Sequence, residues 1–82
     1  MFEHVLIGHA RAQFLALDEH DRDEVERLIR IIELDPWIDG VHKFQVVIEP
    51  FIATAYDNRI WRIVYKIIDN AFIEVSGIKR LP

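Results

Sequence analysis

The stretch Ile60-Trp61-Arg62-Ile63-Val64-Tyr65-Lys66-Ile67-Ile68 decides how the rest of the chain is interpreted. It is rich in β-branched and aromatic residues, with Asp57-Asn58 before it and Asp69-Asn70 after it. Asn and Asp are turn formers because they tolerate positive φ and hydrogen-bond to the nearby backbone. The stretch therefore predicts a strand of about nine residues with a hairpin at each end, which makes it a central strand.

Alternate residues of this strand lie on opposite faces of the sheet. One face is apolar throughout and is expected to pack on the core. Its members are Trp61, Ile63, Tyr65 and Ile67. The other face sets two cations, Arg62 and Lys66, among aliphatic side chains. Such a face suits a partly open surface that can hold an anion.

Composition indicates a single domain, residues 1–82, in a chain of 82 residues. Hydrophobic residues make up 51% and charged residues 29%, which is typical of a globular protein rather than a disordered one. The absence of cysteine excludes disulfides and thiolate metal sites and fits a reducing cytoplasm. No stretch of the sequence predicts export or membrane insertion. A domain this small is often stabilised by a partner or by self-association, so a homodimer is one expectation.

Charge is divided unevenly along the chain. Residues 1–40 carry four arginines and no lysine against ten acidic residues, which gives −6. Residues 41–82 carry six basic against four acidic residues, which gives +2. The acidic half would repel nucleic acid, while the second half can attract it locally. The commoner explanation of the acidic half is a solvated helix face.

The first half predicts a strand followed by two helices. Phe2–Ile7 is a short apolar run and is expected to form a strand. Apolar residues at i, i+4 and i+7 predict a short amphipathic helix over residues 9–18. Asp21 with Glu24 resembles a capping box, which predicts a second helix over residues 21–34.

The second half predicts four strands. Phe44–Ile48 and Phe51–Tyr56 are separated by Glu49-Pro50, because proline cannot donate to a ladder. The central strand, residues 60–68, follows, and Phe72–Ile78 forms the last strand. The predicted order is β-α-α-β-β-β-β, an α+β fold in which a two-helix hairpin packs on one face of a twisted, mainly antiparallel sheet.

The register of the last strand leaves one question open. A two-residue turn before it puts Arg80 on the same face as Trp61. A three-residue loop or a bulge moves Arg80 to the face of Arg62. The sequence supports both arrangements.

Three segments share their order and pattern with a known family. They are a strand and helical hairpin ending in Leu34-Asp35-Pro36, the segment Tyr56-Asp57-Asn58-Arg59-Ile60-Trp61-Arg62-Ile63-Val64-Tyr65, and the segment Ile73-Glu74-Val75-Ser76-Gly77-Ile78-Lys79-Arg80. Together they resemble the RelE/ParE superfamily of bacterial type II toxins, over nearly the whole chain. The second segment is similar to the family's turn followed by aromatic-Arg-aliphatic-aliphatic-Tyr.

The resemblance implies a toxin that a cognate antitoxin holds inactive. Toxins of the RelE branch cleave messenger RNA on the ribosome, and those of the ParE branch inhibit DNA gyrase. For the RelE branch, Arg62 and Arg80 match phosphate-contacting catalytic arginines, which would stabilise the charge that 2′-OH attack develops. Flanking phosphates would be held by Lys43, Arg59, Lys66 and Lys79.

A ribonuclease also needs a general acid and a general base, and the nearby candidates are His42, Tyr65 and Glu74. The predicted strand Phe51–Tyr56 carries no Lys or Arg, where active members often have several. The alternative is a non-catalytic binding module, either a ParE-like gyrase inhibitor or an inactive homologue that binds only an antitoxin. In that case Arg62 forms an ordinary salt bridge with Asp57 or Glu74.

No cofactor and no metal site is predicted. The four histidines have no metal-binding spacing, and the chain has neither a glycine-rich phosphate loop nor a nucleophile elbow. Two classes of function therefore remain, a toxin-type effector that acts on RNA and a binding module without catalysis.

Overall fold

The computed structural model describes residues 1–48 and 50–82, and their elements follow the predicted order. These are β1 (Glu3–Leu6), α1 (His9–Leu15), α2 (Glu19–Leu34), β2 (Lys43–Ile48), β3 (Phe51–Asp57), β4 (Trp61–Ile67) and β5 (Phe72–Arg80). The fold is α+β, with two helices and a five-stranded, mostly antiparallel sheet. Glu49, which the prediction placed in the break between two strands, lies outside the described residues.

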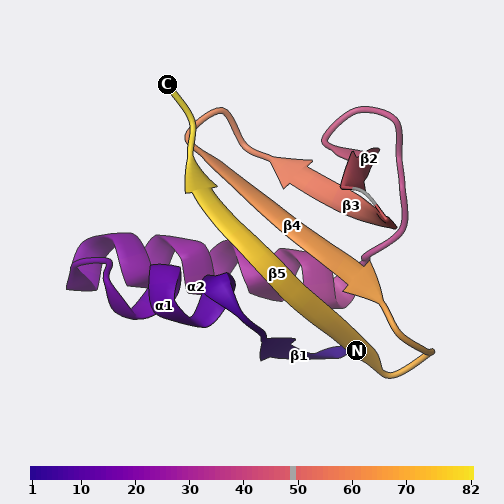
Figure 1. The fold of residues 1–82 in the computed structure, drawn as a ribbon, viewed down its shortest axis with the longest axis horizontal. Coiled ribbons are helices and arrows are strands. Elements are labelled where there is room, and N and C mark those ends of the chain that lie inside the picture. The colour runs from indigo at the N-terminus through magenta and orange to yellow at the C-terminus, as the bar shows by residue number, and fades with distance from the viewer. Residues whose placement is uncertain (49) are drawn as a thin grey trace.

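The strands form one sheet in the order β1-β5-β4-β3-β2, so β4 is the middle strand, as its flanking turns predicted. β1 pairs with β5 in parallel, and the other neighbours are antiparallel. Figure 1 shows β1 beside one end of β5 and the β2–β3 hairpin at the other edge of the sheet. Within residues 1–48 and 50–82, no helix is both long and apolar enough to cross a membrane.

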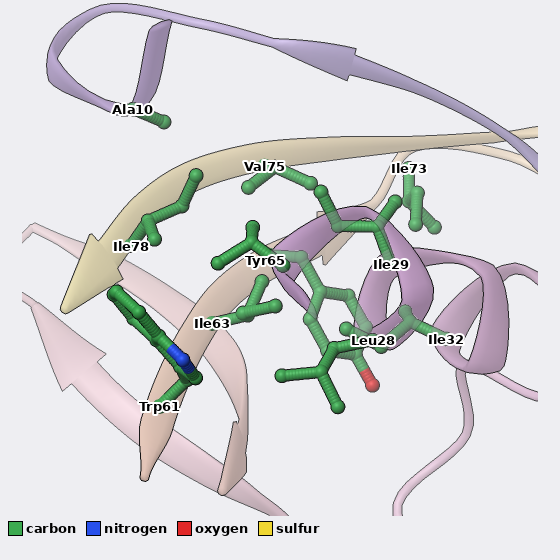
Figure 2. Close-up of a cluster of buried hydrophobic side chains, with 11 residues drawn as sticks. Ala10, Leu28, Ile29, Ile32, Trp61, Ile63, Tyr65, Ile73, Val75 and Ile78 are labelled. Carbon is green, nitrogen blue, oxygen red and sulfur yellow. The ribbon is translucent and has the colours of Figure 1, made fainter. Parts of the chain in front are cut away.

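The core lies between one face of the sheet and the helices (Figure 2). The alternation predicted for β4 is confirmed, because Trp61, Ile63 and Tyr65 are buried while Lys66 is exposed. Apolar side chains from α1, α2 and β5 complete the cluster. They are Ala10, Val25, Leu28, Ile29, Ile32, Ile73, Val75 and Ile78.

The start of α2 corrects one prediction. The N-cap is Asp18 and not Asp21, because the Asp18 side chain accepts a hydrogen bond from the backbone N–H of Asp21 at 2.8 Å. Asp18 therefore forms the cap of the helix, and Glu19 and Asp21 lie in its first turn rather than in a break before it, so these three carboxylates oppose its positive dipole end. α1 is correspondingly shorter than predicted and ends at Leu15.

The register between β4 and β5 contains two one-residue shifts. The first is a three-residue loop, residues 69–71, closed by a hydrogen bond from Ile68 N to Phe72 O at 3.0 Å. The second is a bulge, because Tyr65 pairs with Val75 whereas Val64 pairs with Gly77, which leaves Ser76 without a partner. Each shift turns the later residues to the other face, so the two together return Arg80 to the helix side, opposite Trp61, and place Lys79 opposite Arg62.

Candidate binding site on the open face

The face of the sheet turned away from the helices is called the open face here. Residues directly opposite one another in a ladder share a face, so the pairing to Arg62, Val64 and Lys66 identifies its members. Beside these three they are Phe44, Val46, Phe51, Ala53, Ala55, Asp57, Glu74, Gly77 and Lys79. The surface thus combines apolar side chains with the cations Arg62, Lys66 and Lys79 and the carboxylates Asp57 and Glu74.

Asp57, Arg62 and Lys79 form one row across β3, β4 and β5. Arg62 donates from Nε to Asp57 Oδ1 and from Nη2 to Asp57 Oδ2, both at 2.8 Å. The Arg62 guanidinium also lies over the Phe44 ring, with Cζ 5.4 Å from the centroid. The hydrogen bonds to Asp57 raise the pKa of Arg62 further above its ordinary value. Arg62 is therefore a permanent cation in a fixed position, with its charge compensated by a neighbour.

The turn between β3 and β4 presents Arg59 beside this row. Asn58 Oδ1 accepts hydrogen bonds from the backbone N–H groups of Ile60 at 3.0 Å and Trp61 at 2.7 Å. Arg59 takes a φ of 82°, a conformation that favours glycine, and its side chain is exposed. Within residues 1–48 and 50–82, neither Arg59 nor Lys79 forms an ion pair. Both cations are available to an anion.

A mostly apolar pocket of about 290 Å³ lies at the other end of the open face. Lys66 supplies its cation, and the Lys66 ammonium lies 5.7 Å from the centroid of the Phe51 ring. The pocket is lined by Ile7, Phe51, Ile52, Ala53, Lys66, Glu74 and Ser76. An apolar side chain with an acidic neighbour would fit this combination.

Arg80 lies on the helix side of the sheet, away from Arg62. Its Cζ is 5.6 Å from the Trp61 ring centroid, and its Nη1 is 3.5 Å from Asp21 Oδ2. Trp61 in turn donates from Nε1 to Glu24 Oε2 at 3.4 Å. These contacts connect the end of β5 to the first turns of α2, so Arg80 has a structural position that the sequence did not reveal.

Lys43 also lies on the helix side. It is buried, with 6% of its surface exposed, and among residues 1–48 and 50–82 no other charged residue is buried. Its partner in the ladder is Tyr56. Its Nζ lies 4.0 Å from Asp35 Oδ2 and 5.8 Å from the Tyr56 ring centroid. The structure thus places Arg62, Lys66 and Lys79 on one face of the sheet, with Arg59 at the adjoining turn, and puts Lys43 and Arg80 on the other face.

Of the three candidates for general acid–base chemistry, Tyr65 and Glu74 are not paired with Arg62. The Tyr65 hydroxyl is buried and donates to Pro36 O at 2.6 Å, and burial raises the pKa of Tyr65 above its ordinary range. His42 lies edge-on to Tyr56, with the ring centroids 6.4 Å apart. Glu74 is on the open face but opposite Lys66 rather than Arg62.

One group of side chains in the described residues has the spacing of metal ligands. Asp18, His20 and Asp21 bring ligand atoms within 4.8 Å of one another at the start of α2. Asp18 already caps the helix, and Asp21 lies beside Arg80. The structure gives no reason to assign an ion to this exposed group.

The contacts of Lys43, Phe44 and Asp57 were the functional details that sequence reasoning did not fix. The sequence did not show how β2 and β3 pair, and this pairing sets which side chains of the hairpin lie on the same face as Arg62.

Comparisons with known proteins add nothing to these observations. No family model matches the chain, and neither curated proteins nor solved structures give a match.

Proposed function

We propose that this chain is a toxin-type domain of the RelE/ParE kind that acts as a binding module and does not cleave RNA. The order of one strand, two helices and four further strands supports the proposal. So does an open face that combines cations with apolar side chains. The proposed partner is a protein with acidic side chains, either an antitoxin or a target such as DNA gyrase.

The separation of Arg62 and Arg80 onto opposite faces of the sheet is the observation that carries the proposal. A catalytic guanidinium has to contact the phosphate on which charge develops. Arg62 meets this requirement only when Asp57 is displaced, because its Nε and Nη2 groups donate to the Asp57 carboxylate, both at 2.8 Å. Arg80, the second arginine of the ribonuclease hypothesis, lies over Trp61 on the other face. A binding module, unlike a ribonuclease, needs neither two arginines on one phosphate nor a group that transfers a proton.

The distribution of charge favours a protein over nucleic acid as partner. The chain carries a net charge of −4, and α2 is strongly acidic in its first half, so a polyanion is repelled at long range. The open face places Lys66 in the lining of an apolar pocket and Arg62 over the Phe44 ring. Aromatic residues and arginine beside apolar surface are typical of protein interfaces. An amphipathic acidic segment satisfies both parts of this surface.

Two assays test the proposal. Inducible expression of the chain should arrest growth, and co-expression of a neighbouring reading frame should relieve the arrest by forming a complex. Purified protein incubated with ribosomes and messenger RNA should leave the RNA intact. RNA cleavage that is lost in both Arg62→Ala and Arg80→Ala would contradict the proposal and restore the ribonuclease hypothesis.

A DNA supercoiling assay separates the two kinds of protein partner. Inhibition of gyrase by the purified chain would assign gyrase as its target. A stable complex with the neighbouring gene product, without growth arrest and without gyrase inhibition, would identify an inactive homologue that binds only an antitoxin.

A further inference from the structure

The Arg62 side chain leans across the sheet toward the β2–β3 hairpin. Its backbone lies between Asp57 on β3 and Lys79 on β5, in one row. Its guanidinium nevertheless lies over Phe44, a residue of β2, with Cζ 5.4 Å from the ring centroid. Because β3 separates β2 from β4, this position draws the guanidinium away from Lys79.

Asp57 holds the guanidinium in this position. Its two carboxylate oxygens each accept a hydrogen bond of 2.8 Å, from Nε and Nη2. The edge of the guanidinium formed by Nε and Nη2 matches the two oxygens of a planar carboxylate. The side chains of Arg62 and Asp57 are 36% and 24% exposed, so water reaches the pair and a second carboxylate can compete for the same edge of the guanidinium.

We propose that Asp57 is an internal competitor for Arg62. In the free domain the Asp57 carboxylate occupies the guanidinium, and a carboxylate of the acidic partner displaces it. The released Arg62 then pairs with the partner on the side of Lys79, which has no ion pair within residues 1–48 and 50–82. This inference rests on the proposed function and adds that Asp57 lowers the affinity of the same site for its partner.

The surroundings of Arg62 favour a carboxylate over a nucleic-acid phosphate. Phe44, Val46 and Val64 share its face, and the apolar pocket adjoins Lys66 four residues along β4. A nucleic-acid backbone would place a series of phosphates on this partly apolar surface. A peptide can alternate an acidic side chain at Arg62 with apolar side chains over these neighbours.

Acetate is the probe that tests the inference, with the Nε–H resonance of Arg62 as the readout. The resonance is assigned by its loss in Arg62→Lys, and acetate replaces chloride at constant ionic strength. We expect Asp57→Asn to lower the half-saturating acetate concentration by about twofold to fivefold, the range expected when an exposed ion pair is removed. Glu74→Gln removes the same charge from the same face without touching Arg62, and should change that concentration less than Asp57→Asn does.

The outcomes separate this inference from the proposed function. An unchanged or raised half-saturating concentration in Asp57→Asn would overturn it, because Asp57 would then orient Arg62 for binding rather than compete. Equal changes of the half-saturating concentration in Asp57→Asn and Glu74→Gln would also overturn it, because the change would then come from the lost negative charge in general and not from Asp57 in particular. Inorganic phosphate that binds at least about tenfold more tightly than acetate would overturn the carboxylate assignment. If Asp57→Asn does not fold, Asp57→Ser takes its place. None of these titrations depends on growth arrest, so their outcome is independent of the test of the proposed function.

Discussion

The guanidinium of Arg80 lies over the indole of Trp61, with Cζ 5.6 Å from the ring centroid, on the face of the sheet that Arg62 does not share. This relationship results from two register shifts between β4 and β5, the three-residue loop and the bulge at Ser76. One shift alone would have put both arginines on the open face. Because the two cancel, the last strand contributes Ile78 to the core and Lys79 to the open face.

Deleting Ser76 tests the role of the bulge. Without it Gly77 follows Val75 directly, so regular pairing keeps Gly77 opposite Val64 and Ile78 opposite Ile63 in the core. The free energy of unfolding is therefore expected to stay within about 1 kcal/mol of the parent. Urea denaturation measures the change. Ser76→Ala keeps the bulge and should stay within about 0.5 kcal/mol of the parent. A loss of about 2–5 kcal/mol in the deletion variant, the cost of taking Ile78 out of the core, would contradict the assignment of Ser76 as the extra residue of the bulge.

Replacing Arg80 by Gln is expected to destabilise the fold while leaving the open face unchanged. The variant loses the contact with Trp61 and an exposed ion pair with Asp21, together worth about 1 kcal/mol. Lys79→Gln is the matched control on the adjacent residue, and its effect on stability should be smaller. Thermal unfolding of the two variants measures the difference, and equal midpoints would contradict a structural role for Arg80.

Tyr65 should remain protonated at alkaline pH for as long as the domain stays folded. Burial raises its pKa above the ordinary value, so the stabilisation is complete below about pH 10 and is lost as the pH rises further. Tyr65→Phe removes this alkaline loss, and at neutral pH it costs about 1–3 kcal/mol because Pro36 O loses its donor. Denaturation at pH 7 and pH 11 checks both effects, with Tyr56→Phe as the control. A parent and a Tyr65→Phe variant of equal stability at neutral pH would contradict the account.

Asp39 should stabilise the connection between α2 and β2 in a pH-dependent way. Hydrogen bonds from the backbone N–H groups of Lys43, Val41 and His42 lower the pKa of Asp39 from 3.8 to about 2. Because the folded-state pKa is lowered, the stabilisation is present above pH 3.8 and is lost as the pH falls toward 2. Asp39→Asn should therefore be less stable than the parent at pH 6 and approach it near pH 2. A difference that stays constant over this range would show that the charge of Asp39 is unimportant.

Local patterns predicted the part of the fold that depends on alternation and turns. The alternating residues of β4 and the turn formers on both sides placed it correctly at the middle of the sheet. The start of α2 was misplaced because Asp18 and Asp21 are both acceptable caps in the sequence. Only the hydrogen bond from Asp21 N to Asp18 decides between them.

The candidate site depended on registers that local patterns do not encode. A one-residue shift moves every following side chain to the other face, so Arg80 could not be assigned without the loop length and the bulge. Lys43 was predicted to bind phosphate, but the β2–β3 pairing turns it to the helix side, beside Asp35. The choice of Asp57 over Glu74 as the partner of Arg62 likewise follows from the row that these strands form.

The most direct test of the central claim compares partner binding by two arginine variants. The chain is titrated with the product of the neighbouring reading frame by calorimetry, as parent, Arg62→Ala and Arg80→Ala. We expect Arg62→Ala to weaken binding at least about tenfold, since it removes a charged contact at the interface, and Arg80→Ala to change the affinity less than about twofold. Equal losses in both variants, or full affinity in Arg62→Ala, would contradict the open face as the binding surface.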